Sequence, residues 1–274
     1  MIGSRAGTRD VPQGRRVFQM EWVLMTSPND LAKDAAAKKS LSFVEDGMRL
    51  GLGTGSTAAL MVDALGQKVR NEGLNVTCVA TSIRTAKQAV EAGIKVVSLD
   101  ELKRLDLTID GADEFDPNLN LIKGAGGALL REKIVATASD RMIVISDLSK
   151  QVNVLGAFSL PVEVIQFGWK TTQQLIEETL AGLDVLGAKT TQRMAGDVPY
   201  TTDEGNFIID LHLKEIGDPR QVALMLNQIA GVVENGLLID ICDTVIIGHE
   251  DGTATLRDLD GSMSPDETAD NFFV

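Results

Sequence analysis

The chain has 274 residues, of which 44% are hydrophobic and 24% are charged, a composition typical of folded globular proteins. Its length allows one large domain or two modest ones, each with a hydrophobic core. The formal net charge of −13 disfavours nucleic acid as a partner, because an acidic surface repels phosphate polymers. Membrane insertion is also disfavoured, since no run approaches the roughly 18 to 20 apolar residues that span a bilayer.

The chain begins with an arginine-bearing segment, residues 1–24, that has no clear periodicity. This segment lacks the apolar core of a secretory signal. We therefore expect a disordered extension, which a translation start upstream of Met25 would explain. The spacing of apolar residues then predicts an amphipathic helix over Asp30–Val44, capped by Asn29 or Asp30.

Short apolar runs alternate with segments of helical spacing through the first half of the chain. The predicted strands are Met48–Leu52, Val76–Ala80, Lys95–Leu99, Leu105–Ile109 and Met142–Ser146. The predicted helices between them are Ser56–Asn71, Arg84–Ala92 and Ala128–Ser139. This alternation predicts a parallel sheet covered by helices on both faces, and the wholly apolar strands agree with burial on both sides.

After Pro161 the predicted elements follow the order β-α-β-β-α-β, which fits a small ferredoxin-like α+β unit. The strands are Pro161–Phe167, Thr191–Met194, Phe207–Leu213 and Gly231–Ile239, and the helices are Thr171–Leu183 and Asp218–Ile229. We expect Thr244–Gly248 to return to the first sheet. The predicted domains are residues 25–155 plus 240–257, residues 156–239, and a loose acidic tail of residues 258–274.

The few cysteines and histidines argue against a metal site. Cys78 and Cys242 lie far apart in apolar runs and are expected to be buried thiols in a reducing compartment. His212 and His249 have no His or Cys at ligand spacing. We therefore expect a cytoplasmic protein without a metal ion.

Polar clusters follow four strands of the predicted parallel sheet. They are Gly51–Thr57, Thr81–Ser82, Asp110–Glu114 and Asp147–Lys150. Open α/β sheets bind ligands outside the carboxyl ends of their strands, so we expect these clusters to meet in one crevice.

The first cluster, GLGTGST, predicts a strand, a glycine turn and a helix start. Glycines allow a ligand to approach the backbone, and amides at a helix N-terminus favour a phosphate. A dinucleotide site is less consistent with this cluster, because Ser56 replaces the third glycine of GxGxxG and Thr81 and Ser82 stand where an acid is expected. We favour a compact phosphate ligand, with NAD binding and a purely structural turn as alternatives.

The predicted strand Leu105–Ile109 is followed by Asp110 and Asp113, carboxylates that can orient sugar hydroxyls. A magnesium site is a weaker interpretation, because no six-ligand oxygen pattern can be read. For Glu114 and Asp116 we expect a solvated acidic turn.

A lone lysine, Lys123, precedes a glycine-rich loop and a predicted helix that carries Glu132. Such a loop costs backbone entropy and is favourable if Lys123 and the amides surround a negative group. Glu132 falls on the helix face expected to be buried, where a raised pKa suits a general base. The alternative is a surface glutamate paired with Arg131 or Lys133. The glycines are Gly124, Gly126 and Gly127.

The segments GLGTGSTAAL, LDLTIDGADEFDPNLNLIKGAGGALLREKIVA and PVEVIQFGW together resemble the type A ribose-5-phosphate isomerases, over about residues 29–252. The resemblance implies an open Rossmann-like, mostly parallel sheet with an inserted ferredoxin-like domain. It also implies interconversion of ribose 5-phosphate and ribulose 5-phosphate in the pentose phosphate pathway, without a metal or other cofactor. A homodimer or homotetramer is the implied assembly.

Carried onto matching positions, Glu132 resembles the catalytic base, and Asp110, Asp113 and Lys123 resemble the residues that hold the sugar oxygens. The expected phosphate and substrate contacts are Lys33, Thr54, Gly55, Ser56, Thr57, Ser82, Gly124, Gly126 and Lys150. We expect Glu132 to move a proton from C2 to C1 through a cis-enediolate, with Asp110 or Asp113 assisting ring opening. The alternatives are a non-catalytic phosphosugar sensor, a coenzyme A transferase-like enzyme and an NAD-dependent dehydrogenase.

Overall fold

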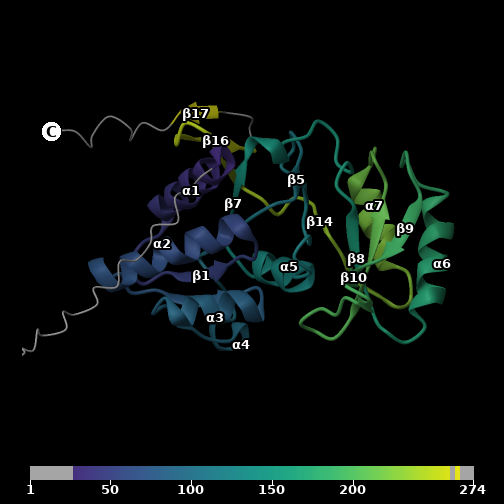
Figure 1. Ribbon diagram of the computed structural model, residues 1–274, viewed down its shortest axis with the longest axis horizontal. Helices are drawn as coiled ribbons and strands as arrows, with labels where there is room; N and C mark the ends of the chain where they lie inside the picture. The colour runs from purple at the N-terminus through teal and green to yellow at the C-terminus, as the bar shows by residue number, and fades with distance from the viewer. Residues whose placement is uncertain (1–26, 260–262, 266–274) are drawn as a thin grey trace, which may run out of the picture.

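The computed structural model describes residues 27–259 and 263–265. The molecule has two parts arranged along its long axis, each built around its own sheet (Figure 1). It is a mixed α/β protein with a mostly parallel central sheet, as the sequence predicted. The predicted extension of residues 1–24 lies outside the described residues.

The central sheet has eight strands and a reversal of strand order near its middle. In spatial order the strands are β17 (Met263–Pro265), β16 (Ala254–Asp258), β15 (Thr244–Gly248), β7 (Met142–Asp147), β4 (Leu107–Asp110), β1 (Arg49–Leu52), β2 (Thr77–Ala80) and β3 (Lys95–Val96). The strands from β15 to β3 pair in parallel, and β16 and β17 are antiparallel. The chain runs outward from β1 to β2 and β3 and then returns to β4 on the other side. This switch point between β1 and β4 is where open α/β sheets bind ligands.

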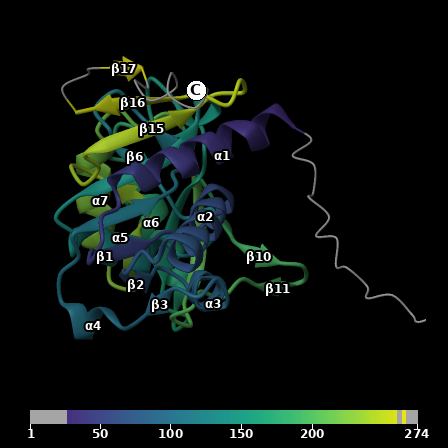
Figure 2. The ribbon, with the colours of Figure 1, turned by 90° about the vertical axis from the view of Figure 1, so that its left-hand side faces the viewer.

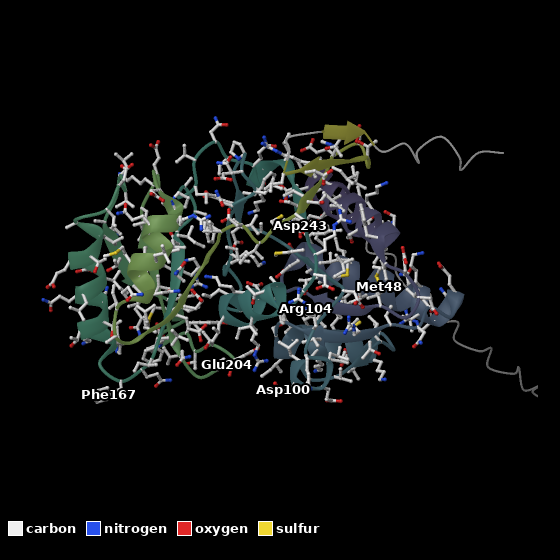
Figure 3. The ribbon with its side chains drawn as sticks, turned by 180° about the vertical axis from the view of Figure 1, so that it is seen from behind. Met48, Asp100, Arg104, Phe167, Glu204 and Asp243 are labelled. Carbon is white, nitrogen blue, oxygen red and sulfur yellow. The ribbon has the colours of Figure 1, made fainter. Side chains whose placement is uncertain are left out.

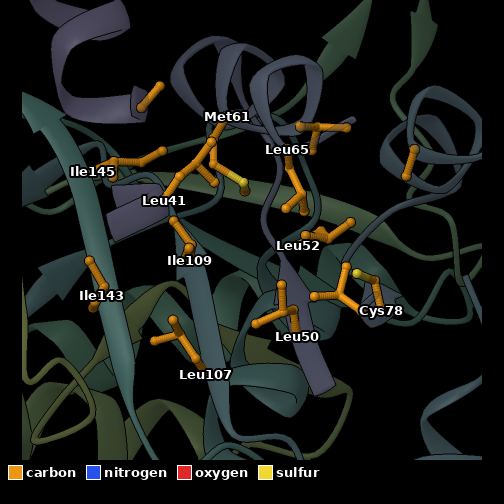
Figure 4. Close-up of a cluster of buried hydrophobic side chains, with 14 of the residues drawn as sticks. Leu41, Leu50, Leu52, Met61, Leu65, Cys78, Leu107, Ile109, Ile143 and Ile145 are labelled. Carbon is orange, nitrogen blue, oxygen red and sulfur yellow. The ribbon is translucent and has the colours of Figure 1, made fainter. Parts of the chain in front are cut away.

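Helices cover both faces of the central sheet. They are α1 (Pro28–Ser40), α2 (Ser56–Glu72), α3 (Ile83–Glu91), the short α4 (Leu99–Leu102) and α5 (Leu129–Thr137). Helix α1 packs against α2, β7 and β15, whereas α5 contacts β4 (Figures 1 and 2). Between α2 and the strands lies the main hydrophobic core, where Met61 and Leu65 meet Leu50, Leu52 and Ile109 (Figure 4). None of the helices in the described residues is long and apolar enough to cross a membrane.

The second part carries a four-stranded antiparallel sheet with two helices. In spatial order its strands are β13 (Val232–Asn235), β8 (Leu160–Val164), β12 (Phe207–His212) and β9 (Lys189–Gln192), and its helices are α6 (Trp169–Leu180) and α7 (Pro219–Asn227). The order β8-α6-β9-β12-α7-β13 follows the predicted ferredoxin-like order. A hairpin of β10 (Met194–Ala195) and β11 (Val198–Pro199) follows β9 in the chain, precedes β12, and projects from the molecule (Figure 2).

Three predicted ends in the first part were wrong, because local capping differs: both ends of the first helix and the end of one strand. Helix α1 is capped by Ser27, whose hydroxyl accepts a hydrogen bond from the Asp30 amide at 3.2 Å, and not by Asn29 or Asp30. It ends at Ser40, where a 3-10 turn replaces the predicted continuation to Val44. The predicted strand Lys95–Leu99 stops at Val96, because the capping box of α4 begins two residues later.

Two predicted strands in the second part are each divided. The segment predicted as Thr191–Met194 is divided at Arg193 between β9 and β10. The segment predicted as Gly231–Ile239 breaks at Gly236 into β13 and β14 (Leu237–Leu238). A Cβ atom at Gly236 would lie 2.3 Å from the Lys123 carbonyl oxygen, so only glycine lets the chain cross this close to the backbone of Lys123.

Strand β14 joins a small third sheet with β6 (Leu121–Ile122) and β5 (Glu114–Phe115). Glu114 and Asp116 are therefore buried, and the solvated acidic turn predicted for them was wrong. Glu114 accepts hydrogen bonds from the amides of Gly156, at 2.7 Å, and Phe158. The predicted loose tail was also wrong in part, since β17 pairs with β16. The domain boundaries stay a prediction.

Candidate active site

A polar cavity of about 290 Å³ opens at the carboxyl ends of β1, β4 and β7. It brings together most of the residues that the sequence singled out. The predicted residues that line it are Lys33, Thr54, Gly55, Ser56, Thr57, Asp113, Lys123, Gly124, Gly126, Glu132 and Lys150. Asp110 and Ser82 do not line it. Gly111, Ala112 and Asp147 also line it and belong to the predicted polar clusters, whereas Ala125 and Ser146 were not among the residues that the sequence singled out.

The turn between β1 and α2 forms one wall of the cavity. A Cβ atom at Gly53 would lie 2.1 Å from Asp110 Oδ1, so this glycine allows the two strand ends to approach. Gly55 is the N-cap of α2, with φ at +133° and no side-chain cap. The first amides of α2 therefore have no side-chain partner and are available to an anion in the cavity.

Ser82 supports this wall from behind. Its hydroxyl accepts a hydrogen bond from Thr54 Oγ1 at 2.8 Å and caps α3 by accepting one from the Thr85 amide at 3.0 Å. Thr81 Oγ1 lies 2.8 Å from Thr54 Oγ1 in the same buried hydroxyl cluster. Ser82 therefore acts on the cavity through Thr54 and does not line it, contrary to the sequence-based expectation.

Two lysines from different elements lie on the cavity wall beside this turn. Lys33 comes from α1, and Lys150 comes from the turn that follows β7. Neither is adjacent to the glycine turn in sequence, and the packing of α1 against β7 brings both to the same cavity. Their charges favour an anionic ligand.

The floor of the cavity holds a buried cluster of one lysine and two carboxylates. Lys123 Nζ lies 3.0 Å from Asp110 Oδ2 and 3.4 Å from Glu132 Oε1, and it donates to the Gly111 carbonyl at 2.5 Å. Asp110 Oδ1 accepts hydrogen bonds from the amides of Thr54 and Gly111, at 3.1 and 2.7 Å. Asp110 is thus held from both sides, which explains its position beneath the cavity wall.

Burial perturbs the proton affinity of all three groups. Burial raises the pKa of Glu132 to about 8; Lys123 opposes this effect, and the charges of Asp110 and Asp113 add to it. The pKa of Asp110 is also raised by burial, against the effect of Lys123. Burial disfavours the charged form of Lys123, but the three carboxylates outweigh it and raise its pKa. A cationic Lys123 therefore stands beside a carboxylate whose proton affinity suits proton transfer near neutral pH.

Glu132 keeps one oxygen available. Its side chain is 4% exposed, and Oε2 has no hydrogen-bond partner among the residues that the structure describes. Leaving a buried carboxylate oxygen without a donor is unfavourable, so such an atom marks a position for a proton or a ligand.

The glycine-rich loop after Lys123 forms the opposite wall. Gly124 and Gly127 have φ of +111° and +75°, values that other residues rarely adopt. The amide of Ala125 donates to Asp113 Oδ2 at 2.8 Å, which fixes that carboxylate at the cavity edge. In the described part of the chain, no group of three or more His, Cys, Asp or Glu side chains is arranged to hold a metal ion.

These features define a Rossmann-like α/β protein with a small polar cavity at its switch point, in which a lysine and two carboxylates are buried. A family model described as ribose 5-phosphate isomerase A (phosphoriboisomerase A) matches residues 77–252. The ribose-5-phosphate isomerase A of Dinoroseobacter shibae is 65% identical over 242 residues, covering 88% of this chain and 93% of that relative.

Solved structures agree with the sequence relatives. Ribose 5-phosphate isomerase A from Methanocaldococcus jannaschii is 37% identical, with a TM-score of 0.77, covering 85% of this chain and 100% of the other. A D-ribose-5-phosphate isomerase in complex with phospho-erythronic acid is 42% identical, with a TM-score of 0.76, covering 82% and 97% of the two chains. The chain belongs to the ribose-5-phosphate isomerase A family and is an isomerase, which confirms the resemblance in its sequence motifs.

Proposed function

We propose that the chain interconverts ribose 5-phosphate and ribulose 5-phosphate through a cis-enediolate, with Glu132 as the proton shuttle. The observation that carries this proposal is the buried pair of Glu132 and Lys123, whose Oε1 and Nζ lie 3.4 Å apart on the floor of a cavity lined by the start of α2 and by Lys33 and Lys150. Membership of the isomerase family supports the same substrate pair.

The chemistry follows from the placement of these two groups. Glu132 removes the proton from C2 of the open-chain aldose, and the electron pair of the C2–H bond forms the C1–C2 double bond of the enediolate. Lys123 stabilises the negative charge that develops on the sugar oxygen. Glu132 then returns its proton to C1, and the proton of the C2 hydroxyl passes to the C1 oxygen. One carboxylate therefore serves as base and then as acid.

The positions of the two aspartates support different roles for them. Asp113 lines the cavity and is the carboxylate available to accept the hydroxyl proton when the furanose ring opens. Asp110 is fully buried beneath Lys123 and holds the ammonium group. We assign ring opening to Asp113 and the orientation of Lys123 to Asp110.

The phosphate is assigned to the opposite end of the cavity. The open amides of α2, the hydroxyls of Ser56 and Thr57, and the charges of Lys33 and Lys150 supply donors for it. The related isomerase solved with phospho-erythronic acid supports a phosphorylated sugar chain as the occupant. A cavity of about 290 Å³ disfavours the alternative of a coenzyme A substrate. A homodimer or homotetramer remains a prediction.

The decisive experiment uses the purified protein after EDTA treatment, with ribose 5-phosphate in heavy water. We expect ribulose 5-phosphate to form with deuterium at C1, because a carboxylate base exchanges its proton with solvent. Conversion without deuterium would contradict a solvent-exchanging base, and tight binding without conversion would favour the phosphosugar sensor. The deuterium content at C1 is measured by NMR.

A further inference from the structure

An arginine from the second part of the molecule reaches into the wall of the cavity. Arg193, between β9 and β10, donates from one terminal nitrogen to the carbonyl oxygens of Gly124 at 2.7 Å and Ala125 at 3.0 Å. Its other edge binds Asp210 of β12, with Nε 2.9 Å from Oδ2 and a second contact from the other terminal nitrogen. The guanidinium plane is therefore fixed by Asp210 and presents its remaining edge to the glycine-rich loop.

Holding two consecutive carbonyls also sets the direction of the amides that follow them. No peptide bond in the described residues is cis, so the N–H of each unit points away from its C=O. The Ala125 amide accordingly points away from Arg193 and donates to Asp113 Oδ2 at 2.8 Å. The Gly126 amide has no hydrogen-bond partner among residues 27–259, and Gly126 lines the cavity.

Tyr200, which follows β11, secures the next peptide unit of the loop. Its hydroxyl donates to the Gly126 carbonyl at 3.1 Å, and its amide donates to the Arg193 carbonyl at 2.9 Å. Glu204, in the turn that follows Tyr200, forms an ion pair with Arg131 of α5. Glu204 lies where the two parts meet, whereas the labelled Phe167 lies away from that junction (Figure 3). The second part thus contacts both the loop and the helix that carries Glu132.

We propose that Arg193 is a positioning residue for the isomerisation: it orients the Gly124 and Ala125 peptide units so that the amides of Ala125 and Gly126 face Asp113 and the sugar oxygens. This inference rests on the proposed function of the cavity. A lysine cannot replace Arg193 here, because the role needs one planar group that binds a carboxylate along one edge and two carbonyls along another. The second part therefore completes the catalytic site.

The test compares turnover with the binding of two probes in Arg193→Lys. We expect kcat for ribose 5-phosphate to fall about a hundredfold, since small misplacements of binding groups have effects of this size. Affinity for phospho-erythronic acid should fall about tenfold, because its carboxylate loses the oriented amides. Affinity for inorganic phosphate should be unchanged, because the α2 turn does not contact Arg193. Isothermal titration calorimetry measures both affinities.

Chemical rescue distinguishes positioning from a loss of folding. Arg193→Ala should regain kcat when guanidinium chloride is added at millimolar concentration, and tetramethylammonium chloride should have no effect. Arg220→Ala is the matched control, because Arg220 pairs with Asp240 at the surface of the same part and is 60% exposed. It should keep wild-type kcat with and without guanidinium. If the Arg193 variants fail to fold, Asp210→Asn is the second variant, because it weakens the paired contacts with the Arg193 guanidinium and keeps the shape of the side chain. It should lower kcat and reduce the affinity for phospho-erythronic acid but not the affinity for inorganic phosphate.

A wild-type kcat in Arg193→Lys, an equal loss of affinity for both probes, or no rescue by guanidinium would overturn the proposal. In the fallback variant Asp210→Asn, a wild-type kcat with unchanged affinity for both probes would overturn it as well. Failure of the proposed function is a separate result, because it appears as a wild-type protein that does not convert ribose 5-phosphate. The two binding measurements still decide the role of Arg193 in that case.

Discussion

The two glycine-containing walls of the cavity are held in different ways. The turn at Gly53–Gly55 is supported by neighbouring strands of its own sheet, through Asp110 and the hydroxyl cluster around Thr54. The loop at Gly124–Gly127 is supported by side chains about 70 residues further along the chain, Arg193 and Tyr200. The first wall is thus a property of the parallel sheet, whereas the second depends on how the ferredoxin-like part docks.

The largest effect is expected at Glu132, the proposed base, which follows the second wall in the chain. Glu132→Gln should lower kcat roughly 10²- to 10⁴-fold, because the amide cannot accept the C2 proton. Affinity for phospho-erythronic acid should be retained, since both walls stay in place. Steady-state kinetics and calorimetry check this, with Glu72→Gln on the exposed face of α2 as the control. Near wild-type turnover would refute the assignment of the base.

The next effect concerns the cation that lies between the walls. Lys123→Met should lower kcat about 10²- to 10³-fold, because the developing oxyanion loses its donor. In the wild type, kcat/KM should fall as the pH drops through about 8, the pKa of Glu132, because only the ionised carboxylate is a base.

In Lys123→Met this acidic limb should move to higher pH, since Lys123 lowers the pKa of Glu132. The pH dependence of kcat/KM measures the shift. The control is Lys68→Met, because Lys68 forms an exposed ion pair with Glu72 on α2. An unchanged limb together with unchanged turnover would exclude the electrostatic role of Lys123.

Two adjacent glycines of the second wall are expected to respond differently to alanine. Gly127→Ala should destabilise the fold by about 1 to 2 kcal/mol or more, because its φ of +75° is left-handed and a Cβ would lie 2.3 Å from the Tyr200 hydroxyl. Gly126→Ala should fold normally, since its Cβ would meet only Thr54 Cγ2, at 3.6 Å, and should raise KM by narrowing the cavity. Urea unfolding and KM measurements check the pair. Equal stability of the two variants would contradict this account of the loop.

The smallest effect is expected behind the first wall. Ser82→Ala should cost about 1 kcal/mol of stability, the usual value of an N-cap, and should lower kcat only slightly through Thr54. Ser98→Ala, at the cap of the short helix α4, is the control and should leave kcat and KM unchanged. A loss of turnover as large as that of Lys123→Met would mean that Ser82 contacts substrate directly.

Much of this site could be predicted because its signals are local. The polar residues after each strand of a parallel sheet must meet at one edge, so Thr54, Asp113 and Lys150 could be assigned to one crevice before their contacts were known. Ser82 was assigned to the same crevice and lies behind it, because sequence position does not reveal which way a hydroxyl points. The division of the Gly231–Ile239 segment was missed, since the crossing at Gly236 depends on the Lys123 carbonyl far along the chain.

By itself, the sequence determined the parallel sheet, the β-α-β-β-α-β order of the second part, and the residue types of the glycine turn after β1 and of the proposed base. These follow from hydrophobic periodicity, glycine placement and motif spacing, which operate within a few residues. The tertiary structure decided between the buried and the surface position that the sequence left open for Glu132. Only the tertiary structure decided that Asp110 lies beneath Lys123 and that Arg193 holds the glycine-rich loop. These depend on burial and on contacts between segments that are distant along the chain, and the contact of Arg193 also depends on the packing of the second part against the first.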